Sequence, residues 1–318
     1  MSGLAPLVVI LGPTASGKSS LAIWLAQQLN GEVLVCDSTQ VYRHFDIGTA
    51  KVPLAEQHGI AHHLVDLVEP DELFTAGEYR RRALLALAEV SQRGKLPILT
   101  AGTGLYLRGL LDGLAEAPER SEELRAHLRA KLQLRGPEHI HRMLARLDPE
   151  IAGRISPRDT QKVIRAIEMR ILAGKPIAEI HRAGRSRLEG YDVQRIGLVP
   201  PRAALNARID ARTAGMIQDG WLDEVRGLVA SGIPPGAKPF QFIGYSDLLA
   251  HLAGRLTVEA AIERIQLATR QFAKRQVTWF RKEPSVHWLP GFGDDPAIAA
   301  ATLAFLKEPA HKFDRQDS

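Results

Sequence analysis

The chain has 318 residues, of which 45% are hydrophobic and 24% charged, and its net charge is +5 with an isoelectric point near 9.4. These values are ordinary for a globular protein that is large enough for two domains. The single cysteine excludes an internal disulfide and a zinc site built from several thiolates. No apolar run approaches the roughly 20 residues of a membrane span, and no cleavable leader precedes the first apolar run. We therefore expect a cytoplasmic protein with no membrane partner.

Residues 12–19, GPTASGKS, match the phosphate-loop pattern of Gly, four residues, then Gly-Lys-Ser. An apolar run at residues 7–11 predicts a buried strand before the loop, and a helical pattern after it ends at Gly31. In this context, backbone N–H groups and a helix N-terminus can hold phosphate oxygens. We predict a site for a di- or triphosphate, with Lys18 on a phosphate and the Ser19 hydroxyl on a Mg²⁺ cofactor. The predicted phosphate-binding residues are Gly12, Thr14, Ala15, Ser16, Gly17, Lys18 and Ser19.

Further apolar runs at residues 33–36, 97–100 and 195–199 predict three more strands. Between the first two, Thr75 and Glu78 have the spacing of a capping box and predict a helix that ends at Gly94. Alternating strands and helices predict an α/β fold, a phosphate-loop parallel sheet flanked by helices. Polar residues at the carboxyl ends of such strands face the ligand crevice, and Asp37 and Thr103 occupy such positions. We expect the strand that precedes Asp37 to lie next to the phosphate-loop strand.

Residues 114–192 differ from the rest because helical patterns and turn signals replace strand-like runs. Since a strand resumes near Arg195, we predict an all-helical insertion domain here. The α/β core then comprises residues 1–113, completed by residues 193–318, which add carboxyl-terminal helices and a long helical run at 257–282. The first 113 residues are slightly acidic and the remainder is basic. A basic second part favours a polyanionic partner such as a nucleic acid, although solvated helices also carry such an excess.

Several stretches, taken together, resemble the tRNA dimethylallyltransferases, which prenylate the exocyclic amine of the adenosine 3′ to the anticodon. They are residues 12–19, 37–42 with 46–51, 102–106, 159–168 and 274–276 with 278–281, and residues 242–245 add to the likeness. These stretches span nearly the whole chain in the order expected of the family. The resemblance implies dimethylallyl diphosphate as donor and the tRNA anticodon stem-loop as partner. The family usually has Gly where this chain has Ala101, a difference of one methyl group.

The resemblance also implies roles for residues at the predicted crevice. Asp37 is expected to be the general base for the acceptor amine, and a second contact to magnesium is the alternative. Thr103 would hydrogen-bond the same amine or the diphosphate, and Lys18 would stabilise the charge that develops on the leaving diphosphate. At least one of Arg208 and Arg212 is also expected to bind the diphosphate, unless both lie on a solvated helix face.

The residues expected to contact tRNA come from the crevice, the insertion and the carboxyl-terminal part of the chain. An adenosine extruded from the anticodon loop would place its base in the crevice, while basic side chains bind phosphates. Phe272, Trp279 and Phe280 could stack bases, but aromatic residues at helical spacing more often belong to a helix core. The expected contacts are Asp37, Ser38, Thr39, Gln40, Thr103, Arg125, Gln161, Lys162, Val163, Ile164, Arg165, Phe242, Gly244, Tyr245, Arg270, Lys274 and Arg275.

Three other functions are compatible with parts of the sequence. A prenyltransferase acting on free adenine nucleotides would share the phosphate loop but would need neither the insertion nor the basic second part. A phosphate-loop kinase or ATPase would need a pocket for a nucleotide base, and an RNA-binding module would leave the phosphate loop unexplained. We expect no metal at His62 and His63, which lack a partner cluster, and we expect a monomer.

Overall fold

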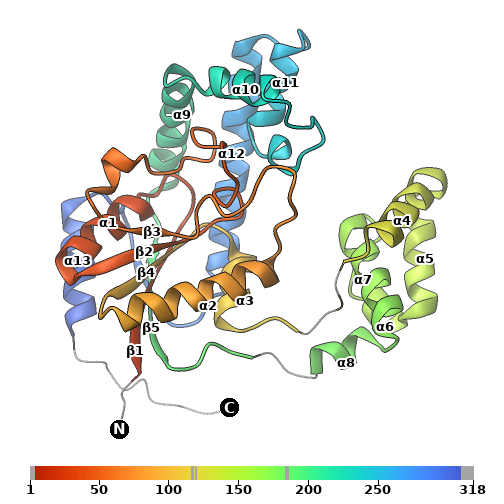
Figure 1. The fold of residues 1–318 in the computed structure, drawn as a ribbon, viewed down its shortest axis with the longest axis horizontal. Helices are drawn as coiled ribbons and strands as arrows, with labels where there is room; N and C mark the ends of the chain where they lie inside the picture. The colour runs from red at the N-terminus through yellow and green to blue at the C-terminus, as the bar shows by residue number, and fades with distance from the viewer. Residues whose placement is uncertain (1–3, 116–117, 119, 183–185, 309–318) are drawn as a thin grey trace. The chain divides into compact units, whose positions relative to one another are not determined.

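The computed structural model of the protein describes residues 4–115, 118, 120–182 and 186–308 (Figure 1). The chain forms two compact units. Unit 1 combines Met1–Leu110 with Glu189–Ser318, and unit 2 consists of Leu111–Leu188. Within the described ranges, no helix combines the length and the apolar character needed to cross a membrane.

Unit 1 is built on a parallel sheet which, among the described residues, has six strands in the order β3-β2-β4-β1-β5-β6. The strands are β1 (Ala5–Leu11), β2 (Gly31–Cys36), β3 (His62–His63), β4 (Leu96–Ala101), β5 (Tyr191–Leu198) and β6 (Val286–Leu289). β1 and β2 are almost entirely buried, as expected of parallel strands covered on both faces. The predicted parallel sheet is therefore confirmed.

The order of the strands differs from the expected one. Ile98 of β4 pairs with Val8 of β1 on one side and with Val33 of β2 on the other. The expectation that the strand before Asp37 lies next to the phosphate-loop strand is therefore wrong, because β4 lies between them.

The start of β5 also differs from the expected boundary of the insertion. β5 begins at Tyr191, which pairs with Ala5, so residues 191 and 192 belong to the sheet. The first half of β5 is polar and only partly buried, and it therefore lacks the apolar run that marked the other strands. β3 and β6, with two and four residues, are too short to produce such a run.

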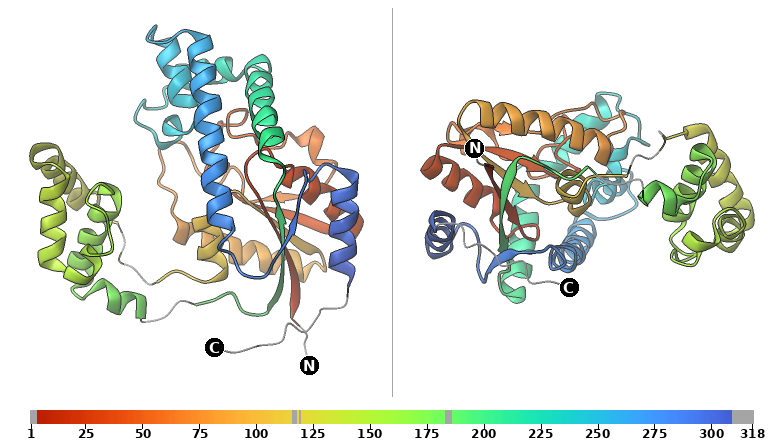
Figure 2. Two further views of the ribbon diagram at one scale, coloured as in Figure 1. Left: turned by 180° about the vertical axis from the view of Figure 1, so that it is seen from behind. Right: turned by 90° about the horizontal axis from the view of Figure 1, so that it is seen from below.

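Helices cover both faces of the sheet (Figure 2). On one face, α1 (Lys18–Leu29) and α13 (Pro296–Lys307) join strand residues in an apolar cluster that includes Ile10 and Leu25. On the other face, α2 (Ala76–Gln92) packs against β2 and β4, and the Tyr79 hydroxyl donates to the Val35 carbonyl at 3.2 Å. The side chain of Thr75 accepts a hydrogen bond from the Glu78 N–H, which confirms the predicted helix start.

Unit 1 has five further α-helices among its described residues. They are α3 (Gly104–Leu111), α9 (Arg202–Gln218), α10 (Trp221–Ala230), α11 (Tyr245–Leu252) and α12 (Val258–Phe280), with short 3-10 turns at Leu54–Gln57 and Lys238–Gln241. α10, α11 and α12 share an apolar cluster in which Trp221, Tyr245 and Phe45 are buried. This cluster fixes the segment after β2 against helices that come much later in the chain.

Among the described residues of unit 2, all regular secondary structure is helical. Its helices are α4 (Glu122–Arg135), α5 (Pro137–Leu147), α6 (Pro149–Ala152), α7 (Thr160–Ala173) and α8 (Ile177–Arg182). Ser121, Asp148 and Asp159 each cap a helix with a side-chain oxygen, as residues of these types do at helix starts. Leu128, Leu144 and Ile167 belong to a core of its own, and the predicted insertion is thus all-helical over its described residues up to Leu188.

Candidate active site

A cavity of about 1680 Å³ opens at the carboxyl edge of the sheet in unit 1. Its wall includes the loop between β1 and α1, the residues after β2 and β4, and side chains of α9 and α12. Because the strands are parallel, loops that follow β1, β2 and β4 meet at one edge, where ligands bind in open α/β sheets. The cavity is therefore the candidate active site.

The phosphate loop is held in a conformation that requires glycine at position 17. Gly17 has φ +86°, and a Cβ there would lie 2.7 Å from Asp294 Oδ1 and from the Gly293 N. The Gly293 N–H donates to the Ser16 carbonyl at 2.8 Å, which braces the loop. The buried Ser16 hydroxyl lines the cavity and has no hydrogen-bond partner among the described residues. A phosphate oxygen is the kind of acceptor that would complete its bonding.

Lys18 is folded onto the phosphate loop itself. Its Nζ donates to the carbonyls of Gly12 and Pro13 at 2.9 and 2.8 Å. Burial lowers the pKa of Lys18 to about 8, although the Asp37 carboxylate opposes this shift, and the charge of Arg212 adds to it. A bound diphosphate would bring negative charge to this ammonium and favour its protonated form.

Asp37 and Thr103 are brought together although they follow different strands. Asp37 Oδ1 accepts from the N–H and the hydroxyl of Thr39 at 2.9 and 2.7 Å. Thr103 Oγ accepts from the Ser38 N–H at 2.9 Å and donates to the Ser38 hydroxyl at 3.2 Å. Asp37 Oδ2 lies against Gly102, where an added Cβ would come within 2.3 Å of it. Only glycine at 102 allows the carboxylate to lie this close to the backbone.

Gln276 connects the two halves of the site, and we predicted no role for it from the sequence. Its Oε1 accepts from the Thr14 N–H, and its Nε2 donates to the Gly102 carbonyl, both at 2.7 Å. The side chain is buried on α12 and bonds the phosphate loop on one side and the loop after β4 on the other. The sequence signal for Gln276 is its place in the stretch 274–276, which carries part of the family resemblance but in which we predicted a role only for Lys274 and Arg275.

Arg208 and Arg212 both line the cavity, but they differ in their partners. Arg208 forms two hydrogen bonds with Asp294, at 2.7 and 2.9 Å, and its guanidinium lies 4.8 Å from the centre of the Phe292 ring. For Arg212, no ion pair is found among the described residues. Desolvation and the charge of Arg208 lower the pKa of Arg212, while Asp37 raises it.

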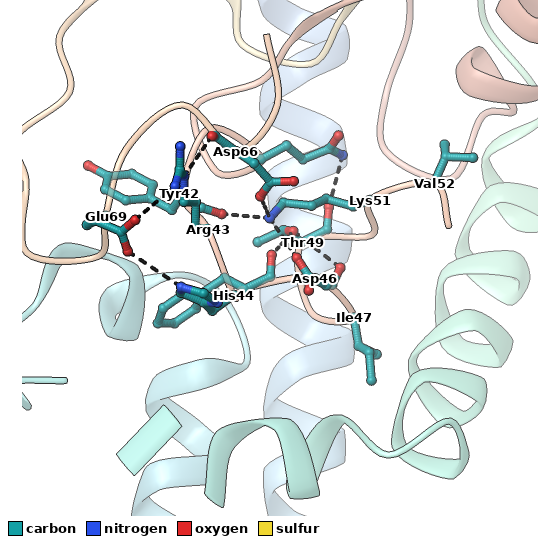
Figure 3. A network of polar contacts seen from close by, with 12 residues as sticks. Tyr42, Arg43, His44, Asp46, Ile47, Thr49, Lys51, Val52, Asp66 and Glu69 are labelled. Atoms are coloured by element: carbon teal, nitrogen blue, oxygen red, sulfur yellow. Dashed lines mark hydrogen bonds and ion pairs between the residues drawn. The ribbon is translucent and has the colours of Figure 1, made fainter. Parts of the chain in front are cut away.

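A network of polar contacts fixes the segment from Tyr42 to Lys51, which forms part of the cavity wall (Figure 3). The Lys51 side chain is only 9% exposed, and its ammonium donates to the Tyr42 carbonyl at 2.6 Å and to the carboxylates of Asp46 and Asp66 at 2.7 and 2.5 Å. Glu224 of α10 accepts from the N–H groups of Asp46 and Ile47 at 2.9 and 2.7 Å. These contacts therefore hold the segment in place as part of the cavity wall.

We expected several residues of unit 1 to contact tRNA, and most of them are accessible from the cavity or from solvent. Ser38, Thr39, Gln40 and Phe242 line the cavity together with Arg275, and Lys274 is exposed beside it on α12. Arg270 pairs with Asp210.

Gly244 and Tyr245 need a correction. The Tyr245 side chain is fully buried and its hydroxyl donates to Glu224, while Gly244 packs under the Trp221 ring. The expectation that these two residues meet RNA is therefore wrong for this structure, because they belong to the helical core.

A similar correction applies in unit 2. The Arg125 guanidinium is buried and forms two hydrogen bonds with the fully buried Glu168, at 2.9 and 2.8 Å. Val163 and Ile164 are part of the apolar core of unit 2. Their side chains serve packing, and the expected RNA contacts of these three residues are not available in this structure. The exposed residues of the same segment are Gln161 and Lys162, with Arg165 partly exposed and paired with Glu168.

The fold and the site together define a phosphate-loop protein whose cavity also holds a carboxylate and cationic side chains. Residues 40–283 of the chain match the sequence profile of a family described as IPP transferase. The chain belongs to this family.

Similar proteins and structures agree with this assignment. The chain is 50% identical over 298 residues to a tRNA dimethylallyltransferase of Solibacter usitatus, covering 94% of this chain and 97% of the relative. It is also 50% identical over 301 residues to a tRNA dimethylallyltransferase of Koribacter versatilis, covering 95% and 98%.

Solved structures with related sequences have the same fold. The tRNA isopentenylpyrophosphate transferase of Bacillus halodurans superposes with a TM-score of 0.69 at 35% identity, covering 95% of each chain. A eukaryotic dimethylallyltransferase, described as acting on tRNA, superposes with a TM-score of 0.81 at 29% identity, covering 98% of this chain and 82% of the other.

Proposed function

We propose that the protein transfers a dimethylallyl group from dimethylallyl diphosphate to the exocyclic amine of the tRNA adenosine 3′ to the anticodon. The observation that carries the proposal is the meeting of a phosphate loop and Asp37 in one cavity, with Thr103 hydrogen-bonded to Ser38 of the cavity wall. A phosphate loop holds the leaving diphosphate, and a carboxylate takes the proton that the amine must lose. Both halves of a prenyl transfer to an amine are thus present within one site.

The donor half of the reaction depends on positive charge around the phosphate loop. As the bond between the allylic carbon and the diphosphate oxygen breaks, negative charge develops on the diphosphate. Loop N–H groups, Lys18 and Arg212 would stabilise that charge where it forms. Of the two arginines, Arg212 is the better candidate because Arg208 is already bound to Asp294.

The residues also fit one Mg²⁺ ion. The Ser19 hydroxyl is on the cavity wall next to Lys18, and an oxygen ligand with further oxygens from diphosphate and water suits this metal. When bound, Mg²⁺ would neutralise charge on the diphosphate.

The acceptor half requires a base and a positioned amine. The new bond forms between the adenine nitrogen and the allylic carbon, and the nitrogen passes one proton to the Asp37 carboxylate. Asp37 Oδ1 is committed to Thr39, and Oδ2 has no hydrogen-bond partner among the described residues, so Oδ2 is the oxygen that would accept the proton. Thr103, fixed by Ser38, would orient the amine.

A competition assay tests the proposal. Purified protein is mixed with labelled dimethylallyl diphosphate, an anticodon stem-loop, AMP and ATP, and label and diphosphate release are followed. We expect label in the RNA and none in AMP, at a rate that ATP does not raise. Label in AMP but not in RNA would contradict the proposal, and so would ATP hydrolysis without any transfer.

A further inference from the structure

Trp279 of α12 presents a large aromatic ring to solvent, unlike the aromatic side chain that follows it in the chain. It is 38% exposed, whereas Phe280, the next residue, is fully buried. The ring packs on α3, where a Cβ on Gly104 would lie 2.1 Å from the Trp279 Nε1. The Arg108 guanidinium lies 4.8 Å from the ring centre. Because Gly104 and Arg108 hold the ring this closely, its exposed position is a defined feature of the surface.

Only one face of the indole ring is covered by α3. Gly104 and Arg108 are four residues apart, so they lie one above the other on the same side of that helix. Both therefore approach the ring from the side of α3, and we assign the exposed part of the ring to the opposite, open face. Arg108 is itself fixed by Glu283, whose Oε1 accepts from its Nε at 3.1 Å. The open face is thus presented in a fixed orientation.

The position of the ring relates it to the active-site cavity. Phe272, Arg275, Gln276 and Trp279 follow the i, i+3, i+4, i+7 spacing of one helix face. The first three line the cavity, and Trp279 continues the same stripe one turn beyond it. Gln276 also bonds the Gly102 carbonyl, two residues before the glycine under the ring. The indole therefore lies next to the loop that carries Thr103.

The surface around the ring has the charge that an RNA backbone requires. Arg275 lies one turn before Trp279 on the same face of α12, and Lys282 follows it by three residues; both are exposed, and no ion pair of either is found in the part of the chain that the structure describes. A positively charged track combined with an open aromatic face is the arrangement on which proteins stack unpaired nucleotides.

We propose that the open face of Trp279 stacks on the base of a nucleotide that directly flanks the extruded adenosine. The inference rests on the proposed function, because it places the acceptor base in the cavity and its neighbour just outside. Stacking there replaces the contact that the flanking base loses when the adenosine leaves the loop. Trp279 would thus help to hold the acceptor in its extruded form.

A double-mutant cycle tests this contact. Stem-loop binding is measured for wild type and Trp279→Ala, each with intact RNA and with RNA made abasic at the nucleotide 5′ or 3′ to the target adenosine. Loss of one stacked base is expected to weaken binding by about 5- to 100-fold. Trp279→Ala should weaken binding of intact RNA by this factor and have no further effect on RNA that lacks the stacked base. Donor binding should stay unchanged, which verifies the fold of the variant.

Two further variants separate stacking from packing. Trp279→Leu keeps apolar contact with Gly104 but has no aromatic face, so it should behave like the alanine variant, and Trp279→Phe should restore most of the affinity. Leu267→Ala, which removes another exposed apolar side chain of α12, serves as control and should leave binding unchanged. Additive effects at both flanking positions, or full affinity of Trp279→Leu, would overturn the inference while leaving the proposed function intact. If wild type neither binds nor alkylates the stem-loop, the proposed function fails and the inference with it.

Discussion

At the scale of a single residue, the role of Asp37 follows from the difference between its two carboxylate oxygens. Oδ1 accepts hydrogen bonds, and Oδ2 has no hydrogen-bond partner among the described residues. Thr39 donates two hydrogen bonds to Oδ1, which fixes the plane of the carboxylate. Gly102 leaves room for Oδ2 beside the backbone. The carboxylate can therefore present Oδ2 to an amine without first changing its conformation.

Replacing Asp37 with Asn distinguishes its two possible functions. Asp37→Asn keeps the shape but cannot take a proton, so kcat should fall by about 10²–10⁴ while the stem-loop still binds. The rate of the variant is measured at saturating donor and RNA over a magnesium titration. A flat, low rate is expected. Recovery of full activity at high magnesium would instead make Asp37 a residue that supports the metal.

The lowered pKa of Lys18 predicts how donor binding depends on pH. The free protein should lose affinity for dimethylallyl diphosphate as the pH rises above about 8, because Lys18 then loses its charge. Bound diphosphate raises this pKa, so the loss should continue at up to about tenfold per pH unit until the complex also titrates. Binding to Lys18→Ala should be weaker and independent of pH in this window. A wild-type affinity that stays constant between pH 7 and about 10 would show that Lys18 does not act as a charge.

Stability should change in the opposite direction over the same pH window. The pKa of Lys18 is lower in the folded protein than the ordinary value of 10.5, so the unfolded chain binds more protons between about pH 8 and 10.5. The contribution of Lys18 to the free energy of unfolding therefore rises with pH through this range. The charged lysine is retained at a cost in stability, as expected of a group that serves a ligand.

At the scale of elements, α12 holds the site together through Gln276. Gln276→Leu would leave the Thr14 N–H and the Gly102 carbonyl without partners, which costs about 1–3 kcal/mol for a buried group. We expect a lower melting temperature together with a lower kcat. Gln271→Leu, at an exposed position of the same helix, is the matched control. Unchanged stability and activity of Gln276→Leu would mean that the two loops hold their positions without the amide.

In unit 2, the Arg125–Glu168–Arg165 cluster stabilises the helices. Burial alone would raise the pKa of Glu168, but hydrogen bonds from Arg125, Arg165 and the Ser121 N–H lower it to about 2. Since this pKa lies below the ordinary 4.5, the cluster stabilises the fold above about pH 4.5, and this contribution is lost as the pH falls toward 2.

Removing Glu168 should therefore destabilise unit 2 selectively. Glu168→Ala leaves a buried arginine unpaired and should cost about 3–5 kcal/mol. Hydrogen exchange of the α7 amides in the full chain, compared with those of β1, measures the effect within each unit. Glu150→Ala, which removes an exposed carboxylate of α6 that pairs with Arg154, is the control. Equal exchange of α7 in wild type and Glu168→Ala would contradict a stabilising role.

At the scale of the whole molecule, local patterns predicted the parts of this protein better than the contacts between them. The phosphate loop, the Thr75 helix cap and the long helix from residue 257 are set by residues close in sequence, and all three are present. The strand order, the burial of Arg125 against Glu168 and the double contact of Gln276 depend on residues far apart in the chain. A single sequence carries no local signal for such contacts. A basic side chain on a helix is therefore predicted to contact phosphate even where, like Arg125, it is buried in the core.

The central claim is that the exocyclic amine of one tRNA adenosine accepts the dimethylallyl group in the cavity of unit 1. The most direct test uses an anticodon stem-loop in which that single adenosine is replaced by purine riboside, which lacks the amine and keeps the ring. Transfer of label is measured for this RNA, for the unmodified RNA, and for one with purine riboside at another adenosine of the loop. We predict no transfer to the first RNA and normal transfer to the other two. Undiminished labelling of the RNA without the amine would contradict the account, because another atom would then be the acceptor.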